Sequence, residues 1–245
     1  MASEEGAPEE TKTLGGADGN DRDVLNVDRF SDVLTSRIIE VTVGFDEKKK
    51  TFLIHEDLLC RESDKMNFQL RGPFKEAQTG KIPDCDEDPA LFAFFTEYLY
   101  RDGWVRKDKA LVHSSEWVLL ARLYAMGERL GAKSFQDACL WKFLRDFTRN
   151  SSIPDSEIVQ LLEIITELPE RNTKDDPLRS AILWYAASKL SRLQKYSAFK
   201  NHLLRNYPDL GGQIVMWAAD STESSRPVEA PKKPDSRFRE EVEFV

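Results

Sequence analysis

The sequence predicts an α+β protein, in which a small β-sheet packs against a larger set of helices. Two observations carry this prediction. Residues 38–60 read as two β-strands that run into a helix, and most apolar residues after position 63 recur at helical spacing. We therefore expect the sheet near the start of the folded region and helices over the rest of it.

The hairpin comes first. Over residues 38–43, β-branched residues alternate with polar ones, which is typical of a half-buried strand. Residues 44–50 break this pattern, and Phe52 and Ile54 mark a second strand. After His55 the apolar spacing becomes helical, so the second strand is expected to lead directly into a helix.

Short segments flank the hairpin. Residues 30–34 fit either a helical turn or an extra strand. Ser63 is placed to cap a helix through Leu70, which ends at the pair Gly72-Pro73. The segment that follows, residues 80–84, predicts at most a small edge strand, because a proline there cannot donate to a sheet ladder.

The later helices begin at recognisable caps. Asp88 and Pro89 open a helix to about Arg101, whose faces are nearly all apolar, which predicts a buried position at the centre of the domain. Ser114 or Ser115 caps the next helix, through Leu130, with Gly131 as its stop. Helical spacing predicts further helices over 133–147, 156–168, 176–194 and 198–207, and the apolar residues Ile214, Val215 and Trp217 close the ordered region.

Both ends of the chain differ in composition from the middle. Residues 1–28 are acidic and residues 221–245 are rich in Ser, Pro and charge, so we expect two disordered tails.

The net charge of −8 disfavours a nucleic-acid partner. The acidic N-terminus does not resemble a signal peptide, and no run of about 18 apolar residues is present. We expect an intracellular protein, cytoplasmic or nuclear, with no membrane partner.

A search for catalytic, cofactor and metal motifs finds none. The three histidines and three cysteines lack the close spacing of zinc ligands, and no phosphate-binding glycine loop or nucleophile elbow is present. Cysteines 60, 85 and 139 fit reduced, buried thiols. The acidic cluster is interpreted as a solvated turn with charge at a helix N-terminus; its members are Asp84, Asp86, Glu87 and Asp88. His55 is interpreted as a structural residue that hydrogen-bonds the local backbone rather than as a base.

An ordered set of residues over 30–147 carries a family resemblance. Its members are Ser31-Asp32-Val33, Val41-Thr42-Val43-Gly44, Phe52-x-Ile54-His55-x-x-Leu58-Leu59-Cys60, Ser63, Gly72-Pro73-Phe74-Lys75-Glu76-Ala77, Asp88-Pro89-x-x-Phe92, Tyr98-Leu99-Tyr100 and Leu119-x-x-Leu123-Tyr124-x-x-Gly127-x-x-Leu130-Gly131. Together they resemble a BTB/POZ domain, most of all the short versions common in fungi. Residues 154–218 resemble the helical extension that follows many such domains.

The resemblance implies a small sheet capped by a helix cluster. It implies structural positions for Asp32, His55 and Ser63. Members of the family that bind cullin-3 often carry an apolar-x-Glu motif after the second helix, and Phe74-Lys75-Glu76 stands in that place. Phe74 and Glu76 are therefore the candidate partner-binding residues. The chain departs from the family after Ser63, where aromatic residues are usual and Asp64-Lys65-Met66-Asn67-Phe68 stands instead.

The expected function is protein–protein interaction without catalysis. The resemblance implies self-association, docking of a protein partner, or both, with cullin-3 as a partner and a role as a ubiquitin-ligase substrate adaptor. A homodimer would have closed two-fold symmetry. No cofactor is expected. The alternative is a transcriptional or chromatin-associated regulator that recruits partners without binding DNA, and an enzyme is the third option.

Overall fold

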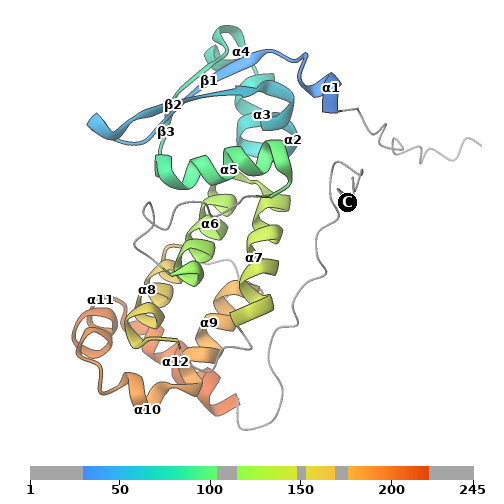
Figure 1. Ribbon diagram of the computed structural model, residues 1–245. Coiled ribbons are helices and arrows are strands. Elements are labelled where there is room, and N and C mark those ends of the chain that lie inside the picture. The colour runs from blue at the N-terminus through green and yellow to red at the C-terminus, as the bar shows by residue number, and fades with distance from the viewer. Residues whose placement is uncertain (1–29, 104–114, 148–152, 169–175, 221–245) are drawn as a thin grey trace, which may run out of the picture.

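The computed structural model describes residues 30–103, 115–147, 153–168 and 176–220. Figure 1 shows a small sheet at one end of the molecule and helices stacked away from it. The described residues thus form a mixed structure with a three-stranded sheet and mostly helices, which confirms the α+β class. The tails expected over 1–28 and 221–245 lie outside the described residues.

The sheet has the strand order β2-β1-β3. β1 is Ile38–Val43, β2 is Lys50–His55 and β3 is Lys81–Cys85. β1 and β2 form the predicted antiparallel hairpin, joined through a short 3-10 turn at Asp46–Lys48. β3 pairs in parallel with β1 at the other edge, so the prediction of a small edge strand is confirmed.

Helices pack around the sheet (Figure 1). They are α1 (Phe30–Val33), α2 (Glu56–Glu62), α3 (Asp64–Arg71), α4 (Lys75–Thr79) and α5 (Pro89–Arg101). The segment before the hairpin is therefore a helical turn. In the view of Figure 1, α2, α3 and α5 lie below the sheet and α4 lies above it. Two predicted caps are confirmed, because the Ser63 side chain accepts from the Met66 amide at 3.1 Å and the Asp88 carboxylate accepts from the Ala90 amide at 2.8 Å.

α5 lies at the centre of the domain, as predicted, but only one of its faces is fully buried (Figure 1). Phe92, Phe95, Tyr98 and Leu99 are buried, whereas the other large apolar side chains of the helix are only half-buried. The reason is its position: α5 lies between the sheet and the next helix pair (Figure 1), so its flanks meet solvent. Phe92 packs against Phe52 of β2, with the ring centroids 5.1 Å apart and the ring planes tilted by 58°.

Two long helices form the middle of the molecule. They are α6 (Glu116–Leu130) and α7 (Lys133–Phe147), with the bounds that the sequence predicts. Ser115 caps α6, accepting from the Val118 amide at 3.4 Å. Gly131 ends it in the left-handed conformation, with φ 63°, which glycine adopts without steric cost.

The C-terminal helices follow the predicted spans only in part. They are α8 (Asp155–Thr166), α9 (Pro177–Ser188), α10 (Leu190–Leu193), a π-helix (Ala198–Leu203), α11 (Leu204–Asn206) and α12 (Pro208–Asp220). The helix predicted over 176–194 is broken at Lys189. The Ser188 hydroxyl donates to the Tyr185 carbonyl at 2.7 Å there, and the Lys189 amide turns to Ala186 at 3.1 Å, which tightens the last turn. The helix predicted over 198–207 begins with π-helical winding.

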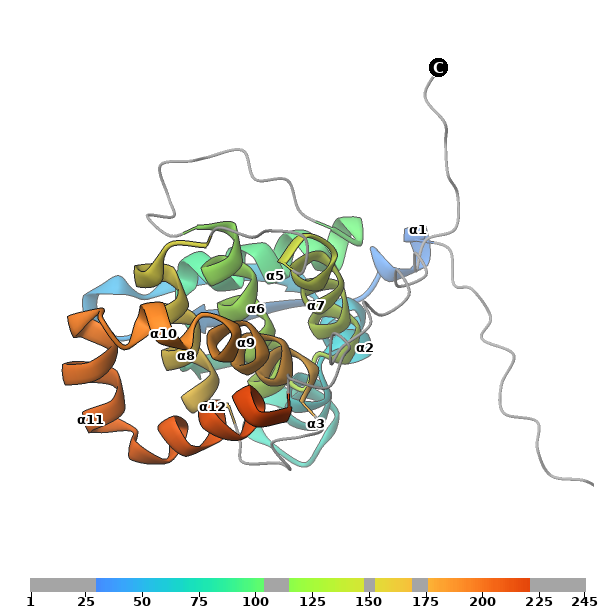
Figure 2. The same ribbon diagram turned by 90° about the horizontal axis from the view of Figure 1, so that it is seen from below.

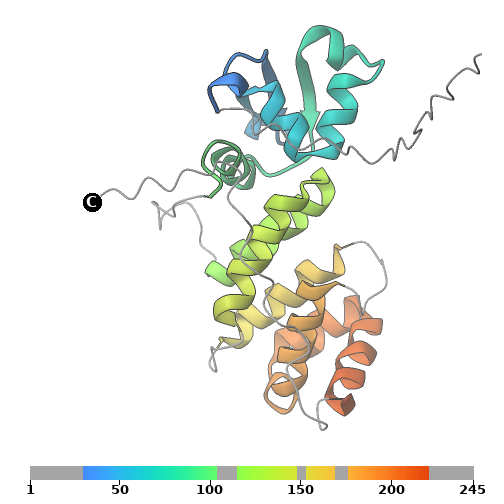
Figure 3. The same cartoon turned by 90° about the vertical axis from the view of Figure 1, so that its right-hand side faces the viewer.

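The hydrophobic core is continuous from the sheet to the last helix. Figures 2 and 3 show the C-terminal helices stacked against the far end of the α6–α7 pair. Aromatic rings join the α6–α7 pair to the C-terminal helices: the ring centroids of Phe147 on α7 and Tyr185 on α9 are 5.0 Å apart. The Tyr124 hydroxyl on α6 donates to Asp176 Oδ2, the cap of α9, at 3.0 Å.

Candidate protein-interaction surface

An exposed aromatic pair lies where α3 meets α4. The Phe68 side chain on α3 is 66% exposed, and its ring centroid is 4.9 Å from that of half-buried Phe74, which precedes α4. A Cβ at Gly72 would lie 2.6 Å from the Phe74 ring and 2.5 Å from the Phe68 carbonyl oxygen. Glycine at position 72 therefore lets Phe74 fold back against α3.

Glu76 follows Phe74 by two residues and lies in the first turn of α4. Its side chain is half-buried, and its carbonyl accepts from the Gly80 amide at 2.9 Å. We call Phe68, Phe74 and Glu76 the α3–α4 surface. It joins the two residues that the sequence singled out with a third, Phe68, which the sequence showed only as a departure from the family pattern.

Arg37 fixes α4 to the sheet. Its Nη1 donates to the Ala77 carbonyl at 2.9 Å, and its Nε donates to Glu56 Oε2 at 2.9 Å. One side chain thus ties the chain just before β1 to the start of α2 and to the middle of α4. The α3–α4 surface is consequently presented on an anchored turn, a requirement for precise recognition.

Ser63 connects α3 to the end of α6. Besides capping α3, its hydroxyl donates to the Leu130 carbonyl at 2.6 Å, and the residue is fully buried. The Asp64 amide donates to the Gly131 carbonyl at 3.3 Å beside it. The N-terminus of one helix therefore meets the C-terminus of another, an arrangement in which the two helix dipoles attract.

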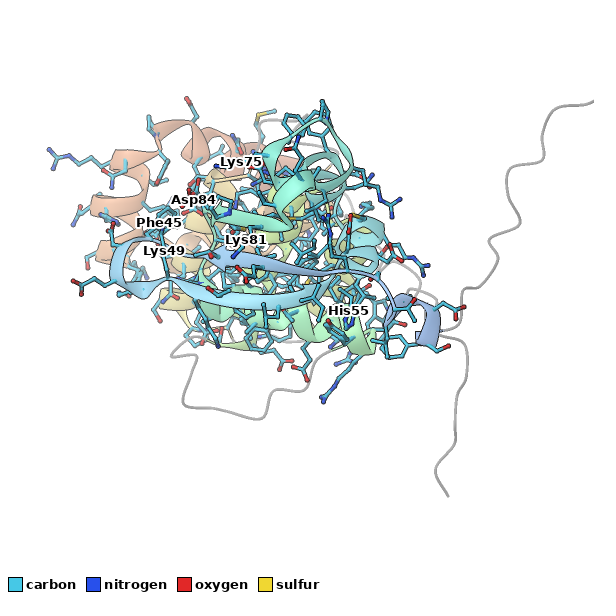
Figure 4. All side chains as sticks on the ribbon, turned by 90° about the horizontal axis from the view of Figure 1, so that it is seen from above. Phe45, Lys49, His55, Lys75, Lys81 and Asp84 are labelled. Atoms are coloured by element: carbon cyan, nitrogen blue, oxygen red, sulfur yellow. The ribbon has the colours of Figure 1, made fainter. Side chains whose placement is uncertain are left out.

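His55 lies at the end of β2, half-buried. The Tyr100 hydroxyl accepts from the His55 amide at 3.2 Å and lies 2.8 Å from the ring Nδ1. The interpretation that this histidine hydrogen-bonds the local backbone is wrong, because its partner is a side chain on α5. Figure 4 shows His55 at the opposite end of the hairpin from Lys49 and Asp84.

Asp32 is exposed on α1. Its carbonyl accepts from both the amide and the hydroxyl of Thr35, at 3.1 and 2.7 Å, and its carboxylate accepts from the Ser31 hydroxyl at 3.4 Å. Asp32, His55 and Ser63 therefore lie at three separate places, and each contacts different partners. The structure does not bring them together as a site.

Glu87 contradicts the interpretation of the acidic cluster as solvated. Its side chain is 3% exposed and accepts two hydrogen bonds from Arg129 on α6, Nε to Oε1 at 2.9 Å and Nη2 to Oε2 at 2.7 Å. Asp84 does stay exposed and pairs with Lys49 at 2.8 Å. The period-2 spacing from buried Cys85 could have placed Glu87 on the inward face.

Glu62 is a second buried acid that sequence reasoning missed. It is 5% exposed, and its Oε1 accepts from the Phe135 amide in the first turn of α7 at 2.6 Å. The two residues are 73 positions apart, so no short motif links them. A carboxylate at a helix N-terminus is favourable because it faces unpaired amides and the positive end of the dipole.

Thiol and metal chemistry find little support in the geometry. All three cysteines are buried, and burial raises the pKa of the Cys85 thiol to about 11 and that of Cys139 well above its ordinary value. Across residues 30–103, 115–147, 153–168 and 176–220, no group of three or more His, Cys, Asp or Glu side chains is arranged to hold a metal ion.

No helix among the described residues is both long and apolar enough to cross a bilayer.

Comparisons with known proteins give no relative. A scan against models of protein families finds no match to this chain, and a search of curated proteins finds none either.

Proposed function

We propose that this chain is a non-enzymatic protein-interaction module that acts inside the cell and docks a protein partner through the α3–α4 surface. The observation that carries the proposal is the Phe68–Phe74 pair, 4.9 Å apart and open to solvent on the Phe68 side. Exposed aromatic side chains on an anchored frame are typical of the residues that dominate protein interfaces.

The fold proposed for residues 30–147 is of the BTB/POZ type. An antiparallel hairpin, a third strand parallel to its first arm and a cluster of helices packed around them (Figure 1) agree with a small sheet capped by helices. The proposed partner is cullin-3, in keeping with the apolar-x-Glu motif at Phe74-Lys75-Glu76, and the proposed role is a ubiquitin-ligase substrate adaptor. Self-association of the chain is the second clause of the proposal.

Co-purification with cullin-3 tests the docking clause. We expect Phe68→Ala and Glu76→Ala each to weaken binding at least about tenfold, because truncating a central interface side chain costs roughly 1.4 to 2 kcal/mol or more. Phe45→Ala is the matched control: Phe45 is 60% exposed but lies at the hairpin turn, next to the end of β3, whereas α4 ends at the start of β3. Absence of binding by the wild type would remove cullin-3 from the proposal. Loss of binding in Phe45→Ala alone would place the binding site at the hairpin turn and not at the α3–α4 surface.

Sedimentation at micromolar concentration tests self-association. The wild type is expected to sediment as a dimer with closed symmetry. A strict monomer would remove this clause and leave the docking clause intact. If Phe68→Ala sediments as the wild type does, the dimer uses a different surface from the partner.

A further inference from the structure

A small cavity lies among the C-terminal helices, away from the α3–α4 surface. It has a volume of about 200 Å³ and is formed by the end of α8, the start of α9 and the start of α12. Its lining is largely polar and includes Arg179, Asn206, Tyr207, Asp209 and Gln213. Arg179 is 5% exposed, so this cavity has a buried cation in its wall.

The guanidinium of Arg179 is only partly satisfied. Its Nη2 donates to the last carbonyls of the α8 region, those of Ile165 at 2.9 Å and Leu168 at 3.0 Å. A guanidinium has five N–H groups. In the described part of the chain, its enclosed Nε has no acceptor and no carboxylate forms an ion pair with it.

Other anchoring arginines of the chain have carboxylate partners. Arg129 pairs with Glu87 at 2.7 Å, Arg192 with Asp155 at 2.6 Å and Arg37 with Glu56 at 2.9 Å, although their side chains are 41 to 44% exposed. Arg179 is far more buried than any of these. The partial negative charge at the end of α8 offsets only about half of an elementary charge. Burying a cation without a full counter-charge is costly, so the site favours an added anion.

We propose that this cavity binds a carboxylate as the counter-ion of the Arg179 guanidinium, which forms part of its wall. The side-chain amides of Asn206 and Gln213 line the same space and offer further donors. Asp209, in the first turn of α12, is the acidic residue of the lining and is exposed. The inference is independent of the proposed function, because it involves neither cullin-3 nor the α3–α4 surface.

The carboxylate has two sources. One is a separate molecule, and the other is the chain itself after α12, where residues 221–245 include Glu223, Glu229, Asp235, Glu240, Glu241 and Glu243. α12 has 13 residues and so spans roughly 20 Å. The 25 residues after it can span up to about 80 Å when extended. An acidic side chain late in this segment can therefore reach back to the cavity beside the start of α12.

The side-chain Nε–H resonance of Arg179, observed by NMR in the full chain, tests the proposal. Sodium acetate is the probe, and sodium chloride at equal ionic strength is its control. Arg192 and Arg129 are internal references, because their Nε atoms already lie on carboxylates at 2.6 and 2.9 Å. Arg179→Lys identifies the resonance by removing it.

Two results support the proposal and separate the sources. A saturable shift with acetate but not chloride, at Arg179 and not at Arg192, shows a site open to an external carboxylate. If acetate shifts the Arg179 resonance only after the six acidic residues of 221–245 are changed to their amides, the chain supplies its own carboxylate.

Two results would overturn it. One is that acetate moves the resonance no more than chloride does in both proteins. The other is that Asp209→Asn, with no acetate added, shifts the Arg179 Nε–H resonance as the loss of a bound carboxylate should. The counter-charge of Arg179 would then be Asp209 and not an added group.

Discussion

Glu87 is the most buried charge-bearing residue of the junction between β3 and α6, and Arg129 is its partner. We expect Arg129→Met to lower the free energy of unfolding by about 2 to 3 kcal/mol, since it leaves a buried carboxylate unpaired. The estimate is below the usual figure for buried pairs because Arg129 is 42% exposed. Urea unfolding measures the change.

Arg101→Met is the matched control for this variant. Arg101 pairs with Glu97 at 2.9 Å on the surface of α5, so its loss should cost less than about 0.5 kcal/mol. The double variant with Glu87→Gln should regain part of the stability lost in Arg129→Met, because the uncompensated charge is removed. Equal effects of Arg129→Met and Arg101→Met would show that the buried pair contributes nothing beyond a surface pair.

The thiol of Cys85 is expected to react slowly in the native protein. Because burial raises its pKa to about 11, its thiolate fraction at pH 8 is roughly a hundredfold below that of a thiol at the ordinary value of 9.0. Its alkylation rate should rise about tenfold for each pH unit between 8 and 10. Alkylation followed by peptide mass spectrometry measures the rate at each cysteine, with the urea-unfolded chain as reference.

At the scale of elements, α3 depends on one cap. We expect Ser63→Ala to lower the free energy of unfolding by about 1 to 2 kcal/mol, because it removes the cap of α3 and leaves the Leu130 carbonyl without its 2.6 Å donor. Ser197→Ala is the control: Ser197 precedes the π-helix, is exposed and makes no side-chain cap bond. A comparable loss in both variants would contradict the assigned role of Ser63.

Local signals explain which elements the sequence predicts. The alternation in β1 and the caps at Ser63, Asp88 and Ser115 act over two to four residues, and all are confirmed. The break at Lys189 and the π-helix at Ala198–Leu203 depend on competing backbone hydrogen bonds that residue spacing does not reveal.

The candidate surface was predictable only in part. A motif pointed to Phe74 and Glu76, but the contact between Phe74 and Phe68 depends on the reversal at Gly72. The buried acids Glu62 and Glu87 were not found, because their partners lie 73 and 42 positions away along the chain. Interactions of this length are decided by the packing of whole helices rather than by the nearby sequence.

At the scale of the whole molecule, aromatic packing joins the sheet-bearing part to the C-terminal helices. Phe147 is 1% exposed and contacts Phe143, Trp117 and Tyr185, with centroid distances of 4.4, 5.7 and 5.0 Å. We therefore expect one cooperative unfolding transition for residues 30–220 rather than two.

Phe147→Ala tests this coupling. It should lower the free energy of unfolding by about 3 to 5 kcal/mol and destabilise both parts together. Four of the five tryptophans lie on α6, α7, α9 and α12, so their fluorescence reports on these helices, and hydrogen exchange of the β1 amides reports on the sheet. If β1 keeps its protection while the fluorescence transition moves to lower urea, the two parts unfold independently.

The bond from Ser63 to the Leu130 carbonyl also bears on the order in which the chain folds. It closes a loop of 67 positions, and the neighbouring bond from Phe135 to Glu62 closes one of 73. Loops of this length form slowly compared with a hairpin or a single helix. The cap of α3 is local, but its bond to α6 therefore forms only after α6 has formed and reached it. Because the bond to Leu130 forms late, its loss is expected to speed unfolding more than it slows folding.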